Sequence, residues 1–386
     1  MSRLKIILLL SYICIASLSS VIITPALPQI QSEYHLSAST LEWVISIFLL
    51  GYVVGQLVYG PIANRFGRLN ALRCGLIINL IGIVICILSV TLMNNYALLL
   101  VGRLVTALGA ASGLVCTFIL INELLPASLV KSVMAYAVLS FTFGVGLSVT
   151  IGSLLTEYAS WHDCFWVLLL HGIIMLFFTW AFTENSKQKI AIHPRVIFAN
   201  YKKAFSHPRL IIFSLMAGIV SVYSYCCSAA APIYSQIDLH LSPSHYGYWS
   251  LLNTLGMLIS GFLSAYFIKK YGAKNTLLIG IACMIPFLIS LLLISICHHA
   301  NTPWFFITTM CLFIITGFLF PTASYFASNA IDDRASASAA MSFINMGLAT
   351  LSVIVLGYLP FSALTSFVII LCVLFVAVTI MVLKLI

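Results

Sequence analysis

The sequence Gly60-Pro61-Ile62-Ala63-Asn64-Arg65-Phe66-Gly67-Arg68-Leu69-Asn70-Ala71-Leu72-Arg73 is a short basic turn between two long apolar runs. The runs cover about residues 41–62 and 71–93. Each is long enough to cross a hydrocarbon core about 30 Å thick, which takes roughly 20 apolar residues. The turn therefore predicts the connection between two membrane helices. Insertion leaves short loops rich in Lys and Arg inside the cell, so its arginines predict a cytoplasmic position.

The composition excludes an ordinary soluble protein. Of the 386 residues, 62% are hydrophobic and only 7% are charged, whereas about 25% are charged in soluble domains. A transmembrane barrel would alternate apolar and polar residues in short segments, but these runs are unbroken. We therefore expect an all-α polytopic membrane protein in a lipid bilayer. The net charge of +9 follows from basic loops on one face, so we expect no nucleic-acid partner.

The apolar runs predict twelve transmembrane helices in two six-helix, pseudo-symmetric halves. The halves are residues 1–184 and 209–386, joined by the polar, basic stretch 185–208, which we expect to be a cytoplasmic linker. The basic turn at 269–274 repeats the first-half turn, as expected of a transporter built from repeats. Of 18 Lys and Arg residues, Arg103 alone falls inside a predicted span. The others fall in loops or helix ends that this topology places in the cytoplasm, together with both termini.

The opening turn resembles the loop between helices 2 and 3 of the major facilitator superfamily, whose pattern is G-x-L-A-D-R-x-G-R-[KR]. The resemblance implies a gating loop made by Gly60, Asn64, Arg65, Gly67 and Arg68. The usual acid of this loop ties it to neighbouring helix ends. Asn64 stands at that position, so it can supply hydrogen bonds there but no charge.

Further motifs resemble the Bcr/CflA-like drug efflux branch of that superfamily. Predicted helix 1 closes in Thr24-Pro25-Ala26-Leu27-Pro28, similar to Y-L-P-A-L-P. The second half carries the most specific resemblance, in the order Ala230-Ala231-Pro232-Ile233, Leu241-Ser242-Pro243, Tyr246-Gly247 and Asn253. On predicted helix 5, Gly144 and Gly152 fit part of the antiporter pattern G-x-x-x-G-P-x-x-G-G. Glycines at this spacing also permit close helix contact without functional meaning.

The resemblance implies a substrate site near the membrane midplane, at the interface of the halves. The residues that we expect to line it are Thr24, Gln56, Arg103, Tyr223, Tyr225, Asn253, Phe320 and Tyr325. This mixture of aromatic rings and hydrogen-bonding groups suits a bulky amphipathic or cationic-aromatic molecule. The alternative for each aromatic residue is simple packing between helices. A lone charge at membrane depth is costly, so Arg103 needs a partner or a water-filled cavity.

Proton coupling requires a group that titrates while it faces the cavity. The branch usually carries an acid on helix 1, but Val21 stands there. Two candidates remain. Glu42 lies at a depth similar to that of Arg103 and could pair with it. His171 could titrate near neutral pH, or could instead hydrogen-bond to a neighbouring helix.

The leading hypothesis is a bacterial inner-membrane transporter that exports small amphipathic molecules by alternating access, with proton antiport as one mode of coupling. Alternatives are a dedicated exporter of one endogenous metabolite or siderophore, an uncoupled facilitator, and a non-transporting sensor or scaffold. We expect a monomer with no cofactor. The eleven cysteines form no C-x-x-C pair, so we expect packing residues and no metal site. No nucleophile and base share a predicted face, so we expect no enzyme.

Overall fold

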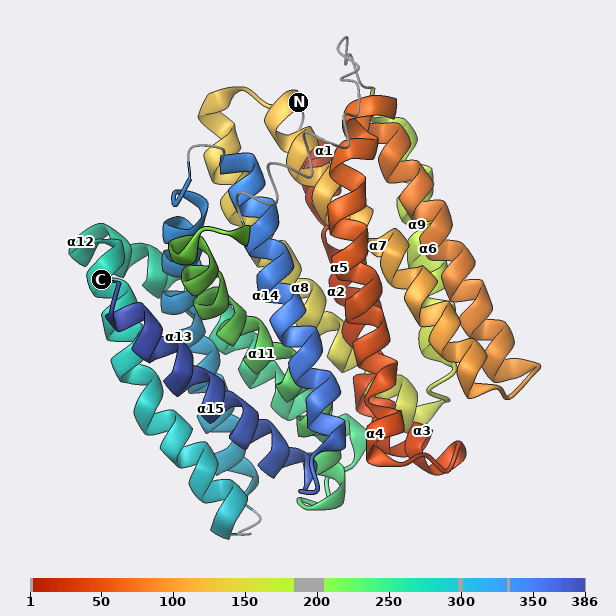
Figure 1. The fold of residues 1–386 in the computed structure, drawn as a ribbon. Coiled ribbons are helices and arrows are strands. Elements are labelled where there is room, and N and C mark those ends of the chain that lie inside the picture. Colours follow the sequence, from red (N-terminus) through yellow and green to blue (C-terminus); the bar gives the residue numbers. More distant parts are fainter. Residues whose placement is uncertain (1–2, 184–204, 298–300, 332–333, 386) are drawn as a thin grey trace. The chain divides into compact units, whose positions relative to one another are not determined.

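The computed structural model describes residues 3–183, 205–297, 301–331 and 334–385. Within these ranges the regular structure is helical and contains no strand (Figure 1). In the described ranges, eleven helical segments are long and apolar enough to cross a membrane. The longest, Pro243–Ile296, consists of two helices that meet at Gly272. Counting that pair as two gives the twelve crossings that the sequence predicted.

The chain divides into two compact units, each built from neighbouring helices. Unit 1 comprises residues 1–26 and 43–192, and unit 2 comprises residues 27–42 and 193–386. The elements are α1 (Arg3–Ser11), α2 (Cys14–Val21), η1 (Thr24–Ala26), α3 (Leu27–Glu33), α4 (Ala38–Leu41), α5 (Trp43–Phe66), α6 (Arg68–Thr91), α7 (Tyr96–Leu124), α8 (Ala127–Tyr158), α9 (Asp163–Phe178), η2 (Thr179–Ala181), α11 (Pro208–Ile237), α12 (Pro243–Cys297), α13 (Thr302–Ser328), α14 (Arg334–Tyr358) and α15 (Ala363–Leu383). The predicted boundaries of the two halves stay a prediction, and residues 185–204 of the expected linker lie outside the described ranges.

In unit 1, α7 is the central helix, with α5 and α6 packed along it. Small residues let the backbones approach. A Cβ added to Gly82 would lie 2.2 Å from the backbone nitrogen of Thr106, and one added to Gly109 would lie 2.2 Å from that of Asn79. The amide of Asn79 donates to the Thr106 carbonyl at 2.9 Å. Close packing between small residues is the usual means of helix association in a membrane.

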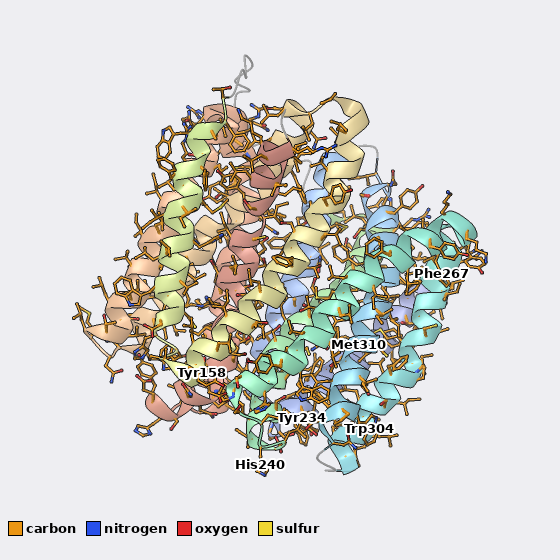
Figure 2. All side chains as sticks on the ribbon, turned by 180° about the vertical axis from the view of Figure 1, so that it is seen from behind. Tyr158, Tyr234, His240, Phe267, Trp304 and Met310 are labelled. Atoms are coloured by element: carbon orange, nitrogen blue, oxygen red, sulfur yellow. The ribbon has the colours of Figure 1, made fainter. Side chains whose placement is uncertain are left out.

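In unit 2, α11 packs against α13, α14 and α15, and α12 packs along α13. The short helices α3 and α4 belong to this unit and pack against α11 and α14 respectively. Figure 2 shows Trp304 and His240 toward one end of this unit and Phe267 toward the other, with Met310 between them. The start of α13 and the turn after Phe267 therefore lie at opposite ends of the bundle.

The basic turn within residues 60–73 is shorter than predicted. Helix α5 continues to Phe66 and α6 begins at Arg68, so the turn is the single residue Gly67, with φ 99° and ψ 149°. Gly272 has φ 79° and ψ 165° at the matching place in α12. Only glycine adopts such positive φ values readily. The second-half repeat of the turn is thus confirmed in its backbone conformation.

Candidate functional site

The first membrane crossing is broken into α1, α2 and η1, and then continues as α3. The break between α2 and η1 has a chemical cause, since Pro25 has no N–H and cannot bond to the carbonyl of Val21. The Thr24 hydroxyl donates to that carbonyl instead, at 2.9 Å. Cys164 on α9 donates its S–H to the next carbonyl, that of Ile22, at 3.7 Å. Backbone groups inside a bilayer need such partners, because lipid supplies none.

Arg103 on α7 binds the same broken region. Its guanidinium donates to the carbonyls of Ser19 and Ser20 on α2 and of Val44 on α5, the last two at 3.1 and 3.2 Å. Its Cζ atom lies 4.5 Å from the centroid of the Phe48 ring. The residue is 1% exposed. We call these five residues the Arg103 cluster. The sequence predicted that Arg103 needs a partner, and within unit 1 three carbonyl dipoles and one aromatic ring are its partners.

Helix α8 presents a residue to α1 and α2 at every fourth position. Ser140 donates to the carbonyl of Leu10 and Ser148 to that of Leu18, each at 2.9 Å. Between and after them are Gly144 and Gly152. A Cβ added to Gly144 would lie 2.2 Å from the hydroxyl oxygen of Ser17. A Cβ added to Gly152 would lie closer still to the carbonyl oxygen of Ile22. The close helix contact that the sequence left open for these glycines is therefore present.

Unit 2 has a polar contact of a different kind between α11, α12 and α13. The Thr309 hydroxyl donates to the side-chain carbonyl of Asn253 at 2.8 Å, and the Tyr223 hydroxyl donates to the backbone carbonyl of Thr309 at 2.7 Å. The Tyr223 ring is fully buried and lies 4.7 Å from the ring of Phe313 and 5.9 Å from that of Phe367. We call Asn253, Thr309 and Tyr223 the Thr309 cluster.

The remaining predicted lining residues differ in exposure. Thr24 is buried, whereas Gln56 on α5 and Tyr225 on α11 are half-buried. The Gln56 side-chain oxygen is buried without a hydrogen-bond partner in the described part of the chain. On α13, Phe320 is 38% and Tyr325 57% exposed. The eight predicted residues are divided between the two units, so their convergence on one cavity stays a prediction.

The predicted gating loop contains an ion pair. Arg68, the first residue of α6, lies 2.5 Å from the carboxylate of Glu123 near the end of α7. Asn64 and Arg65 lie in the last turns of α5, and Asn64 is half-buried. A Cβ added to Gly60 would meet nothing within 4 Å. Asn64 cannot make a charged contact between helix ends. Such a contact is instead formed by Arg68 and Glu123 of α7.

The two predicted coupling residues lie in different units. Glu42 follows α4 in unit 2 and is 3% exposed. His171 is half-buried on α9 in unit 1. Pairing of Glu42 with Arg103, which belongs to unit 1, stays a prediction. No group of His, Cys, Asp and Glu in the described ranges could hold a metal ion.

Sequence reasoning missed the residues that complete the two clusters, above all the backbone carbonyls of Ser19, Ser20 and Val44, and the side chains of Phe48 and Thr309. The available signal was indirect. Pro25 predicts a disturbed helix and therefore carbonyls in need of donors. Arg103 is the nearest strong donor at membrane depth, but nothing in the residue types of positions 19 and 20 indicates that their main chain binds it.

Comparisons with known proteins agree on one family. The family model of the Major Facilitator Superfamily matches residues 9–352. A bicyclomycin resistance protein homolog of Haemophilus influenzae is 23% identical over 264 residues, which are 67% of this chain and 65% of that protein. A putative multidrug resistance protein, MdtD of Pectobacterium atrosepticum, is 26% identical over 243 residues, 59% of this chain and 51% of that protein. The chain thus spans about two thirds or less of these relatives' lengths.

A solved structure supports the same fold. The crystal structure of a D-xylose-proton symporter superposes with a TM-score of 0.79, covers 98% of this chain and 97% of its own, and is 16% identical. Identity at that level shows the fold alone. The superfamily is one of multi-pass membrane transporters and not of enzymes. Since its family model covers most of the sequence, the chain belongs to the Major Facilitator Superfamily.

Proposed function

We propose that the chain exports small amphipathic organic molecules across a bacterial inner membrane by alternating access, in exchange for protons. The observation that carries this proposal is the broken first crossing with Arg103 bound to it. Irregular backbone at membrane depth is tolerated where it is buried in protein or lines a water-filled cavity. In transporters, interrupted helices commonly contribute to the substrate site near the midplane.

The Arg103 cluster serves this function by keeping polar backbone in a fixed arrangement. The guanidinium fork spans two helices, since it reaches α2 through Ser19 and Ser20 and α5 through Val44. The guanidinium therefore holds the broken end of α2 at a set distance from α5. Arg103 acts in this proposal as a positioning residue, and the substrate is bound by neighbouring groups such as Gln56, whose side-chain oxygen has no partner within the described ranges.

The substrate class follows from the side chains that the sequence assigns to the site. Aromatic residues such as Tyr225, Phe320 and Tyr325 offer faces for stacking, and Asn253 offers an amide. Such a set favours bulky amphipathic or cationic-aromatic molecules. Two relatives are named for drug resistance, and this supports export as the direction. The proposed orientation has both termini in the cytoplasm, because the basic loops then lie inside.

Transport into inside-out vesicles tests the proposal. The substrate is a fluorescent aromatic cation, measured with and without an imposed proton gradient. The variants are Arg103→Lys and, as the matched control, Arg209→Lys, because Arg209 is exposed at the start of α11. Lysine keeps the charge but cannot reproduce a planar fork with several fixed donors. We expect accumulation that depends on the gradient, reduced about tenfold or more by Arg103→Lys, in line with the 1.4 kcal/mol that a factor of ten represents.

The other outcomes have distinct meanings. Entry of the dye only to equal concentration on both sides, without any effect of the gradient, contradicts proton coupling and favours the facilitator. Absence of accumulation for cationic, neutral and anionic amphipathic dyes alike overturns the broad export proposal. Normal transport by Arg103→Lys at normal expression removes Arg103 from the proposed machinery.

A further inference from the structure

Residues 27–42, which we call the 27–42 hairpin, comprise the end of the first crossing, the turn after it and the start of the second crossing, and they belong to unit 2. Helix α3 packs against α11, and α4 packs against α14. The hairpin is anchored by apolar side chains without solvent exposure, those of Leu27, Ile30 and Leu41. A segment that the sequence prediction assigns to the first half is therefore part of the helix packing of unit 2.

Glu42 lies where the 27–42 hairpin meets α14. It follows α4 directly, and its side chain is 3% exposed. A Cβ added to Gly357 of α14 would lie 2.8 Å from Cγ and 3.0 Å from Cβ of Glu42, and 3.0 Å from Cα of Ser39. The absence of a side chain at Gly357 thus allows α4 to approach α14 and brings the stem of Glu42 against the helix.

We propose that Glu42 is the proton-carrying carboxyl of the transport cycle, and that its protonation keeps the 27–42 hairpin docked on α11 and α14. This inference rests on the proposed function and deepens it. A carboxylate is far more costly to remove from water than a neutral carboxyl. One proton from water adds to the Glu42 carboxylate as the hairpin docks, and the same proton returns to water when the hairpin leaves.

The groups around Glu42 within unit 2 are compatible with this role. The fully buried Cys226 thiol of α11 interacts electrostatically with Glu42. On α14, Tyr358 follows Gly357 and is 63% exposed. The hairpin itself carries Glu33 and His35, which are both exposed. These two exposed residues serve as controls.

Hydrogen exchange of the purified full chain measures docking without any substrate. Labelling times are scaled so that the intrinsic exchange is equal at pH 5.5 and pH 8.5, and uptake is compared for peptides that cover 27–42. We expect at least twofold lower uptake at pH 5.5 in the native chain. Glu42→Gln should give low uptake at both pH values, because its side chain is always neutral. Glu33→Gln and His35→Asn should keep the native pH dependence.

A second pair of variants tests the contact between the 27–42 hairpin and α14 by steric exclusion alone. Gly357→Ala places a methyl group against the stem of Glu42, so we expect high uptake in 27–42 at both pH values. Gly347→Ala, on the same helix, is the matched control, since an added Cβ there meets nothing within 4 Å. Uptake in the native chain that is equal at the two pH values overturns the inference, as does a native pH dependence in Glu42→Gln. Neither result depends on transport, so failure here is distinguishable from failure of the export proposal.

Discussion

The two halves use equivalent positions for opposite kinds of contact. Phe48 precedes Gly67 by 19 residues, and Asn253 precedes Gly272 by the same number. Arg103 follows the N-cap Asn95 of α7 by 8 residues, and Thr309 follows the N-cap Asn301 of α13 by 8. The pair formed by Arg103 and Phe48 thus corresponds to the pair formed by Thr309 and Asn253. A cation over a ring in one half corresponds to a neutral hydrogen bond in the other.

The direction of hydrogen bonding to the first helix of each half is also reversed. In the first half, Arg103 of α7 donates to carbonyls of α2. In the second half, Tyr223 of α11 donates to a carbonyl of α13. The helix that receives donors is broken, whereas α11 is continuous over Pro208–Ile237. An arginine at membrane depth therefore accompanies a broken helix, and a threonine suffices beside an unbroken one.

The largest effect is expected from removal of the donor that the broken helix needs. Arg103→Ala removes the guanidinium donor from three carbonyls, and those of Ser19 and Ser20 lie at the broken end of α2, where each unsatisfied group costs about 1–3 kcal/mol. We expect stability to fall by about 3 kcal/mol or more in total. The matched change in the other half, Thr309→Val, keeps the side-chain shape, loses the hydroxyl that bonds to Asn253 and to the Phe306 carbonyl, and should cost about 1 kcal/mol. Melting temperatures of the two purified variants in the same detergent provide the measurement. Equal, small decreases would show that the Arg103 cluster and the Thr309 cluster contribute equally to stability.

The sequence predicted the crossings well because long apolar runs and basic turns report directly on the bilayer. It also predicted that Arg103 needs a partner. It did not predict the partner, because the carbonyls of positions 19 and 20 are main-chain groups that every residue type possesses. Their availability depends on where Pro25 breaks the helix in three dimensions. The extent of the turn was wrong for a related reason, since the polar residues before Gly67 continue α5.

The glycines of the two halves give an intermediate effect. Gly152→Ala forces a methyl group against the carbonyl of Ile22, which is backbone and cannot move aside alone. Overpacking of this kind costs about 1–3 kcal/mol. At Gly218 of α11, the nearest atom to an added Cβ is a methyl carbon of Leu348, at 2.9 Å, which can rotate away. We therefore expect a smaller loss of melting temperature for Gly218→Ala.

Gly261→Ala calibrates this comparison, because an added Cβ there meets nothing within 4 Å and alanine is the better helix former. That variant should melt at or above the native temperature. If Gly152→Ala behaves like Gly261→Ala, then α8 does not need its close approach to α2. The small residues at every fourth position of α8 would then have no energetic role.

The smallest effect should come from the Thr309 cluster in the second half. It tests whether the contacts within that cluster contribute independently to stability. Tyr223→Phe removes one hydroxyl and keeps the ring packed on Phe313, so we expect a loss of about 0.6–1 kcal/mol. The bond it loses ends on the Thr309 backbone, which Thr309→Val retains. The two changes should therefore add, with a coupling energy below about 0.5 kcal/mol in a double-mutant cycle.

The same cycle in the first half should give a different answer. Arg103 and Phe48 interact directly, with the guanidinium over the ring, so Arg103→Ala and Phe48→Leu remove one shared contact. Their coupling energy should reach about 0.5–2 kcal/mol, as expected for a desolvated cation over a ring. Additive behaviour in both halves would mean that Arg103 is held by backbone carbonyls alone. Phe48 would then fill space around the broken helix just as any apolar side chain could.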